Sequence, residues 1–368
     1  MFDKVTASLP DIWAYLKQTD KPIYIYGMGD GADKMLSALD RFGIACAGFF
    51  ASDGFVRGQV FHGQTVLSFG EVHERYGGDF IALMAFGSRR PEVIDYVRGI
   101  ASMCEFYVPE LPVTGDILFT ADFYAAHKAE HDEVRAMLCD ELSVRVFDEM
   151  IRYRLTGNLD ILLAGHMSTH EDEALALIGA DKVSTYMDLG AYTGDTIREL
   201  IRFKSEQGAE PLRKIRALEP ERHSHKKLSE YLTTLDGIDA RAHQACASDR
   251  NGSVQFTSGR GRGSRTGKGT EVACMTPDSL CTDTFIPDYI NYDVEGAEHA
   301  AINGTADTLA AHAPALNVAL YHRPEDIFDL PLLVKRINGQ YKLYMRRHGG
   351  IPGWDLNLYC VNIQRSNK

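Results

Sequence analysis

Apolar residues recur at two spacings along this chain, and the two spacings alternate from one end to the other. Runs at 23–26, 215–218 and 289–292 are apolar or nearly so throughout, which is typical of strands buried on both faces of a sheet. Amphipathic stretches with helical spacing, such as 33–42 and 197–203, lie between such runs. Strands that alternate with helices in this way predict an α/β fold with mostly parallel sheets.

The alternation is interrupted once, and this divides the chain into three regions. Residues 1–112 predict a small Rossmann-like α/β domain of the nucleotide-binding type. Residues 113–171 predict a helical connector, in which one long helical stretch over 120–155 stops at Gly157. Residues 172–368 predict a second, larger α/β domain.

The stretch 186–196 is the most informative part of the second domain. A short apolar run ends at Asp188, two glycines (Gly190 and Gly194) bracket a tight turn, and a helical pattern follows. Strand, glycine turn and helix N-terminus form the place where open α/β sheets receive a nucleotide-like ligand. Glycines suit such a turn because a side chain would hold the ligand away from the backbone. We expect Asp188 to accept a hydrogen bond from a cationic amine.

Three later strand ends carry residues that fit the same ligand. Glu219 ends the second predicted strand of this domain, where a carboxylate can accept both ribose hydroxyls of an adenosine moiety. The third run ends near Ala247 and the fourth at Asp293. Together these strand ends predict a class I S-adenosylmethionine (SAM) site. The predicted cofactor-binding residues are Asp188, Gly190, Ala191, Tyr192, Gly194, Thr196, Glu219, Ala247 and Asp293.

The same motifs resemble those of the FkbM-type methyltransferases. The resemblance runs through residues 188–196, 218–220, 276–280 and 293–298, roughly the second half of the chain. It implies a class I methyltransferase sheet that ends in an antiparallel hairpin, and an O-methyltransferase that modifies a hydroxyl of a sugar or small hydroxylated metabolite. One position departs from the pattern: Asn291 stands in the pair before Asp293 where family members usually carry a lysine.

Methyl transfer to a hydroxyl needs a base, because a neutral hydroxyl oxygen is a poor nucleophile. His322, after the fifth predicted strand, is the expected general base since histidine titrates near neutral pH. Asp293 and Glu295 are the other predicted catalytic residues, with Asp293 as the alternative base. We expect Glu298 to cap a helix or face solvent. Asp278, Asp293, Glu295 and His322 could also form a magnesium or manganese site, but their spacing does not require one, and we predict no metal.

Two further stretches are candidates for binding the acceptor. The loop 258–269 carries four cations and predicts a lid that clamps an anionic substrate, such as a sugar phosphate or nucleotide sugar; a solvated hairpin loop is the alternative. A glycine turn after the strand 23–26 fits G-x-G-x-x-A, so it either binds a nucleotide or nucleotide sugar or belongs to a domain that only docks on its neighbour. The predicted substrate-binding residues are Arg260, Arg262, Arg265, Gly27 and Gly29.

Composition and charge limit the alternatives. A net charge of −12 over 368 residues argues against a general nucleic-acid binder, and no apolar run is long enough to span a membrane. Seven scattered cysteines without a C-x-x-C motif indicate reduced thiols, so we expect a cytoplasmic enzyme whose partner is a small-molecule acceptor; a homo-oligomer stays open. The second hypothesis is a nucleotide-sugar-binding or NAD-dependent protein centred on Gly27, Gly29 and Asp53, with an inactive second domain.

Overall fold

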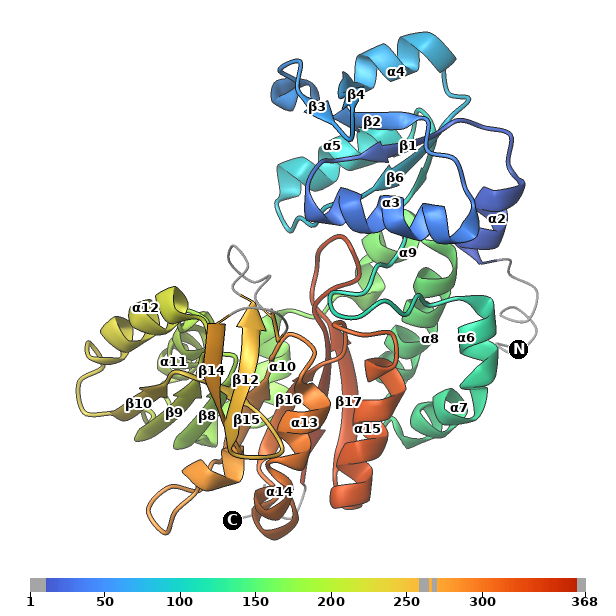
Figure 1. Ribbon diagram of the computed structural model, residues 1–368. Helices are drawn as coiled ribbons and strands as arrows, with labels where there is room; N and C mark the ends of the chain where they lie inside the picture. The colour runs from blue at the N-terminus through green and yellow to red at the C-terminus, as the bar shows by residue number, and fades with distance from the viewer. Residues whose placement is uncertain (1–10, 258–264, 267–269, 363–368) are drawn as a thin grey trace.

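The computed structural model describes residues 11–257, 265–266 and 270–362, and it contains two separate α/β parts joined by a helical segment (Figure 1). Each part is built on its own mostly parallel sheet. This arrangement confirms the predicted fold class, a Rossmann-like methyltransferase sheet preceded by a smaller Rossmann-like domain.

The first sheet has five parallel strands, and both of its faces are covered by helices. Its strand order is β5 (Leu67–Ser68), β2 (Gly48–Ala51), β1 (Ile23–Tyr26), β6 (Ile81–Met84) and β7 (Glu105–Tyr107). Alternate residues of β1 enter different cores. Ile23 and Ile25 pack with α2 (Ile12–Gln18) and α3 (Asp30–Phe42), while Tyr24 and Tyr26 belong to the core that includes α4 (Phe69–Tyr76) and α5 (Pro91–Ala101). Burial on both faces explains the continuous apolar run.

The connector is helical over most of the predicted stretch 120–155, but this stretch is divided into several helices. The described helices are α6 (Ala121–Ala126), α7 (Lys128–Met137), α8 (Glu141–Thr156) and α9 (Leu159–Leu163). The chain breaks before α8 because Asp140 adopts an extended conformation and its carboxylate accepts the Ser143 N–H at 2.7 Å, as an N-cap does. Gly157 ends α8 with φ +61°, in agreement with the predicted glycine stop.

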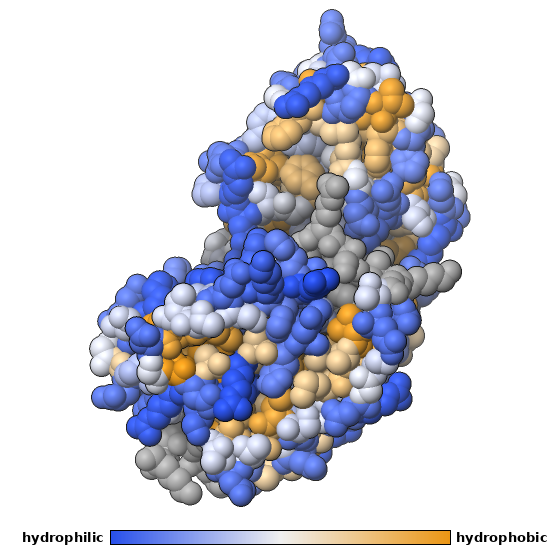
Figure 2. Space-filling view, turned by 60° about the vertical axis from the view of Figure 1, so that its left-hand side comes forward, coloured by the Kyte–Doolittle hydropathy of each residue, from blue (hydrophilic) through white to orange (hydrophobic). Residues whose placement is uncertain are grey.

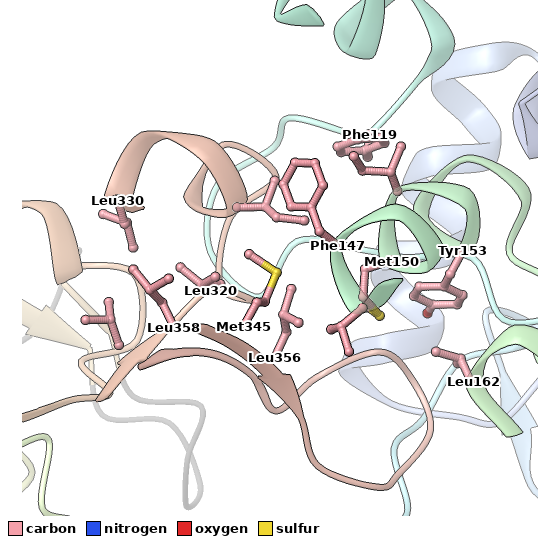
Figure 3. Packing of buried hydrophobic residues seen from close by; sticks show 14 of the residues in the cluster. Phe119, Phe147, Met150, Tyr153, Leu162, Leu320, Leu330, Met345, Leu356 and Leu358 are labelled. Atoms are coloured by element: carbon pink, nitrogen blue, oxygen red, sulfur yellow. The ribbon is translucent and has the colours of Figure 1, made fainter. Parts of the chain in front are cut away.

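The connector helices share one hydrophobic core with the second domain. Figure 3 shows Phe147, Met150 and Tyr153 of α8 facing Leu320, Met345 and Leu356 across this core. All six side chains are almost completely buried. The connector is therefore packed as part of the second domain's body.

The second sheet has seven strands. Their order is β10 (Asp239–His243), β9 (Lys214–Leu218), β8 (Thr185–Leu189), β15 (Tyr289–Tyr292), β16 (Ala315–Ala319), β18 (Leu356–Val361) and β17 (Lys342–Arg347). β18 runs in the opposite direction to the other six strands, which gives the closing hairpin that the resemblance implied. Residues of α10 (Glu171–Leu177), α11 (Asp195–Glu206) and α12 (Arg222–Leu232) enter the core on one face. Those of α13 (Glu298–Asn303), α14 (Ala306–His312) and α15 (Asp326–Ile337) enter the core on the other.

A small second sheet stands beside the large one. Its order is β11 (Ala245–Ala247), β14 (Thr270–Met275), β12 (Gly252–Thr257) and β13 (Arg265–Thr266). The run that ends near Ala247 therefore leaves the main sheet after β10, instead of being its third strand.

The face shown in Figure 2 is mostly hydrophilic, with apolar side chains in small separate patches. Among the helices that the structure describes, none combines the length and apolar character needed to cross a bilayer.

Candidate active site

A pocket opens at the carboxyl edge of the large sheet, where the turn after β8 passes the end of β15. Gly190 has φ +86°, and a Cβ at this position would overlap the carbonyl oxygen of Asp293. Only glycine allows both this backbone conformation and this close approach. The requirement for glycine here therefore comes first from the packing of two strand ends, and only then from a ligand.

Glu219, at the end of β9, forms the wall of the pocket next to this turn. Its Oε2 accepts the backbone N–H of Tyr192 at 2.8 Å, and its Oε1 accepts that of Glu221 at 2.8 Å. The carboxylate is 6% exposed, and burial raises its pKa to about 7 although the two backbone donors oppose this shift. Two backbone hydrogen bonds fix the carboxylate in place while each oxygen keeps a lone pair for a ligand.

Asp188 lies beneath the pocket, outside the set of described residues that line it. Its Oδ2 accepts the Thr196 hydroxyl at 2.5 Å, and its Oδ1 accepts the Asn291 amide at 3.0 Å. The side chain is completely buried, and burial raises its pKa to about 7. Asn291, the position that departs from the resembled pattern, therefore holds Asp188 with a neutral amide. The expected contact of Asp188 with a cationic amine stays a prediction.

The other predicted cofactor residues divide into two groups. Gly190, Tyr192, Thr196, Glu219, Ala247 and Asp293 line the pocket. Ala191 is completely buried, and Gly194 forms the N-cap of α11, where a Cβ would lie 2.8 Å from the Tyr231 ring. Neither is among the described lining residues, so we attribute the small size of both to packing.

Asp293 and Glu295 form the acidic end of the pocket, beyond β15. The Tyr321 hydroxyl donates to both carboxylate oxygens of Asp293, at 3.0 and 3.2 Å. Glu295 has φ +53°, a strained conformation for a residue with a side chain. Thr114, from the segment after the first domain, supports it by donating its hydroxyl to the Glu295 carbonyl at 2.9 Å.

His322 sits behind these carboxylates, which does not favour the expected role as general base. It is completely buried and absent from the described lining of the pocket. Its Nε2 lies 3.3 Å from Asp293 Oδ1 and 3.6 Å from Glu295 Oε2, and its Nδ1 lies 2.9 Å from Glu298 Oε1. Burial lowers its pKa, but the three carboxylates outweigh burial and raise it to about 10. An imidazole that is protonated at neutral pH cannot accept a proton from an alcohol.

Glu298 does not face solvent, which corrects one alternative of the sequence analysis. Its Oε1 accepts the N–H of Val294 at 2.8 Å and of Gly296 at 3.4 Å, so it caps the turn between β15 and α13 from a completely buried position. Its position as the residue facing His322 was missed, since spacing alone cannot show which helical carboxylate turns inward.

Asp278 takes no part in this cluster. Its carboxylate accepts the backbone N–H groups of Asp307 and Thr308, both at 3.1 Å, at the start of α14. The four-residue metal set considered from the sequence is therefore wrong in this member.

The predicted substrate-binding residues belong to the loop 258–269 and to the glycine turn of the first domain. Arg260 and Arg262 lie outside the described residues, and for Arg265 only the backbone, in β13, is described. Gly27 (φ +126°) and Gly29 (φ +101°) lie in the first domain and are not among the described lining residues of the pocket. Asp30 and Asp33 occupy the first turn of α3, where their charges repel a phosphate. A nucleotide at this glycine turn stays a prediction.

The first domain nevertheless contributes to the pocket through Arg89, a residue that the sequence analysis did not identify. Ser88 and Ile351 exchange two backbone hydrogen bonds, of 2.7 and 3.0 Å, which hold the loop after β6 against the loop between β17 and β18. Arg89 then pairs with Asp355 at 2.6 Å and with Glu171 at 3.5 Å, and all three residues line the pocket. Both domains therefore form its mouth.

One family model and several solved structures are similar to this chain. Residues 188–349 match the family model of the Methyltransferase FkbM domain. The crystal structure of methyltransferase FkbM from Methylobacillus flagellatus KT superposes with a TM-score of 0.70 at 20% identity, covering 95% of this chain and 92% of that one, so the two share the fold. Precorrin-6y C5,15-methyltransferase from Geobacter metallireducens GS-15 gives a TM-score of 0.32 at 10% identity, over 53% of this chain and 88% of that one. No protein of curated function matches. Residues 188–349, somewhat less than half of the chain, are therefore similar to the Methyltransferase FkbM domain.

Proposed function

We propose that this protein is a SAM-dependent O-methyltransferase that modifies a hydroxyl group of a sugar or another small hydroxylated metabolite. The observation that carries the proposal is the arrangement of one pocket. Glu219 stands on one side of the Gly190 turn, and Asp293 with Glu295 stands on the other.

The two acidic positions are spaced for the two ends of one methyl donor. They follow β9 and β15, which flank β8, so two strand spacings separate them, on the order of 10 Å. Glu219 is oriented by two backbone donors and can accept both ribose hydroxyls of an adenosine moiety. SAM bound with its ribose at Glu219 would supply an activated methyl group near Asp293.

The carboxylates at the acidic end are the groups that can handle the acceptor's proton. A hydroxyl placed against Asp293 can donate to it, and Tyr321 keeps this carboxylate in one orientation. Glu295 lines the same end of the pocket, and we assign it to holding a second acceptor hydroxyl. His322 acts through Asp293 and Glu295, and we therefore assign it as a positioning residue.

The composition of the mouth favours a small polar acceptor. Arg89, Glu171 and Asp355 place charges of both signs where the two domains meet. Such groups recognise hydroxyls through short hydrogen bonds. All seven cysteines are free thiols, which supports a reducing compartment such as the cytoplasm.

Calorimetric titration of the full chain with SAM and, separately, with NAD tests the proposal. We expect SAM to bind and NAD not to. Glu219→Ala should weaken SAM binding about 10- to 100-fold, the range for losing a charged hydrogen-bond acceptor. Glu230→Ala is the matched control, because this exposed glutamate of α12 pairs only loosely with Lys226, at 3.8 Å. NAD binding without SAM binding, or wild-type affinity in Glu219→Ala, would refute the assignment.

The acceptor itself requires a second experiment. A panel of sugars, nucleotide sugars and small hydroxylated metabolites is incubated with methyl-labelled SAM, and label transfer is measured. Label on a hydroxyl oxygen supports O-methylation. Label found only on nitrogen or carbon would contradict it while leaving the cofactor assignment intact.

A further inference from the structure

We propose that His322, Asp293 and Glu295 form a binding site for one divalent cation, with Glu298 orienting the histidine from behind. This site goes beyond the proposed methyl transfer, because it requires neither the methyl donor nor a particular acceptor. Three observations support it: the direction of the imidazole, the unsatisfied atoms and the balance of charge.

The imidazole is oriented as a metal ligand is. Glu298 Oε1 lies 2.9 Å from Nδ1, close enough for an ion pair although the two atoms are not in hydrogen-bonding geometry, and Nε2 lies on the side of Asp293 and Glu295. Metal-bound histidines characteristically have such a carboxylate behind them, which fixes the ring and its tautomer. The Nε2 atom then faces Asp293 Oδ1 at 3.3 Å and Glu295 Oε2 at 3.6 Å. Ligand atoms that share a cation at about 2.1 Å lie about 3 to 3.5 Å apart.

Three buried atoms of the cluster lack hydrogen-bond partners among the described residues. Nδ1 and Nε2 of His322 and Oε2 of Glu298 make no hydrogen bond, although both residues are completely buried. A buried polar atom without a partner is costly, so each such atom in a native protein calls for an explanation. A cation in front of Nε2 gives that nitrogen its partner.

The charges of the cluster also favour a cation. Asp293 and Glu298 lie on either side of the imidazole, with one atom of each of the three residues within 4.8 Å of the others, and Glu295 Oε2 lies 3.6 Å from Nε2. Buried carboxylates are tolerated when they are paired or coordinate a metal. A single imidazolium offsets one negative charge, whereas a divalent cation offsets two.

The donor set indicates the class of cation. One imidazole nitrogen with carboxylate oxygens suits first-row transition ions such as Mn²⁺ or Zn²⁺, while Ca²⁺ and Mg²⁺ prefer oxygen ligands alone. Mn²⁺ is the practical probe because its paramagnetic signal reports the free ion directly. Without a cation, His322 is the imidazolium that pairs with the same carboxylates, so binding of the cation has to displace the proton on Nε2.

The test is a Mn²⁺ titration of the full chain without SAM, followed by electron paramagnetic resonance. We expect one saturable Mn²⁺ per chain, and at least a tenfold weaker affinity in both Asp293→Asn and Glu298→Gln. Asp293 is the safer variant for folding because its side chain is 38% exposed. The matched control is His299→Gln, which removes an exposed histidine 3.5 Å from Asp329 in the same domain and should leave binding unchanged.

Three results would overturn the site. The first is that the wild-type chain shows no saturable Mn²⁺ binding up to millimolar concentration. The second is that Asp293→Asn binds Mn²⁺ as tightly as the wild type, and the third is that His299→Gln abolishes binding. Since SAM is absent throughout, none of these results depends on whether the proposed function is correct. Thermal unfolding provides a second readout: Mn²⁺ should raise the Tm of the wild type and of His299→Gln, but not that of Asp293→Asn.

Discussion

Replacing Asp188 by asparagine should stabilise the protein at alkaline pH and have much less effect at acidic pH. The carboxyl group is completely buried, and burial raises its pKa from 3.8 to about 7. Asparagine has the same shape and no charge to desolvate. Its oxygen can accept the Asn291 amide, and its NH₂ group can donate to the Thr196 hydroxyl, so both existing contacts can be kept.

The magnitude follows from proton linkage. Because the folded-state pKa is above the unfolded-state value, the native state binds more protons between the two, and stability falls as pH rises through that window. At 1.36 kcal/mol per pH unit the whole window corresponds to about 4 kcal/mol, of which about 2.5 kcal/mol falls between pH 5 and pH 8. Asp188→Asn removes this dependence, so its advantage over the wild type should grow by about that amount from pH 5 to pH 8.

Urea denaturation at the two pH values, monitored by circular dichroism, measures the effect. Asp236→Asn, at an exposed aspartate in the turn before β10, is the control and should change neither free energy by more than about 0.5 kcal/mol. If Asp188→Asn were destabilised equally at pH 5 and pH 8, the reasoning would fail. Such a result would mean that the hydrogen bonds from Thr196 and Asn291 stabilise the charged carboxylate by more than burial destabilises it.

Three further predictions concern contacts that the two domains or the strand ends share. Thr114→Val should lower kcat several-fold with an unchanged SAM Kd, because the Glu295 carbonyl loses a hydrogen bond worth about 1 kcal/mol. If Thr114→Ser, which keeps the hydroxyl, did not retain kcat, the hydrogen bond would not be the cause. Gly190→Ala should cost more than about 3 kcal/mol and shift the thermal midpoint, since its Cβ overlaps the Asp293 carbonyl; an unchanged Tm would show that the strand ends can separate. Arg89→Ala should raise the acceptor KM while stability changes by less than about 1 kcal/mol, because its ion pairs are half exposed; an unchanged KM would exclude it from the acceptor site.

The first domain is connected to the active site by a continuous set of contacts. Lys34 of α3 donates to the carbonyls of Pro112 and Val113, at 3.2 and 3.0 Å. The next residue, Thr114, bonds to the backbone of Glu295 and, through its own N–H, to the His322 carbonyl at 3.0 Å. These contacts give the first domain a structural role at the site whether or not its glycine turn binds a ligand.

The sequence by itself determined those features that depend on residues close together in the chain. The acidic strand end at Glu219 and the stop at Gly157 each follow from residues close together in the chain, and the structure has both at the expected places. The alternation of strands and helices likewise required only the spacing of apolar residues.

Tertiary structure decided which of the polar residues face the pocket and which are buried behind it. Asp188 and His322 both follow or end strands at the right edge of the sheet, yet neighbouring side chains cover them. Glu298 turns inward because the turn before α13 needs its carboxylate for two N–H groups. Local spacing cannot predict burial of this kind, because burial depends on strand order and on contacts between distant segments. Thr114, for example, bonds to Glu295, about 180 residues further along the chain.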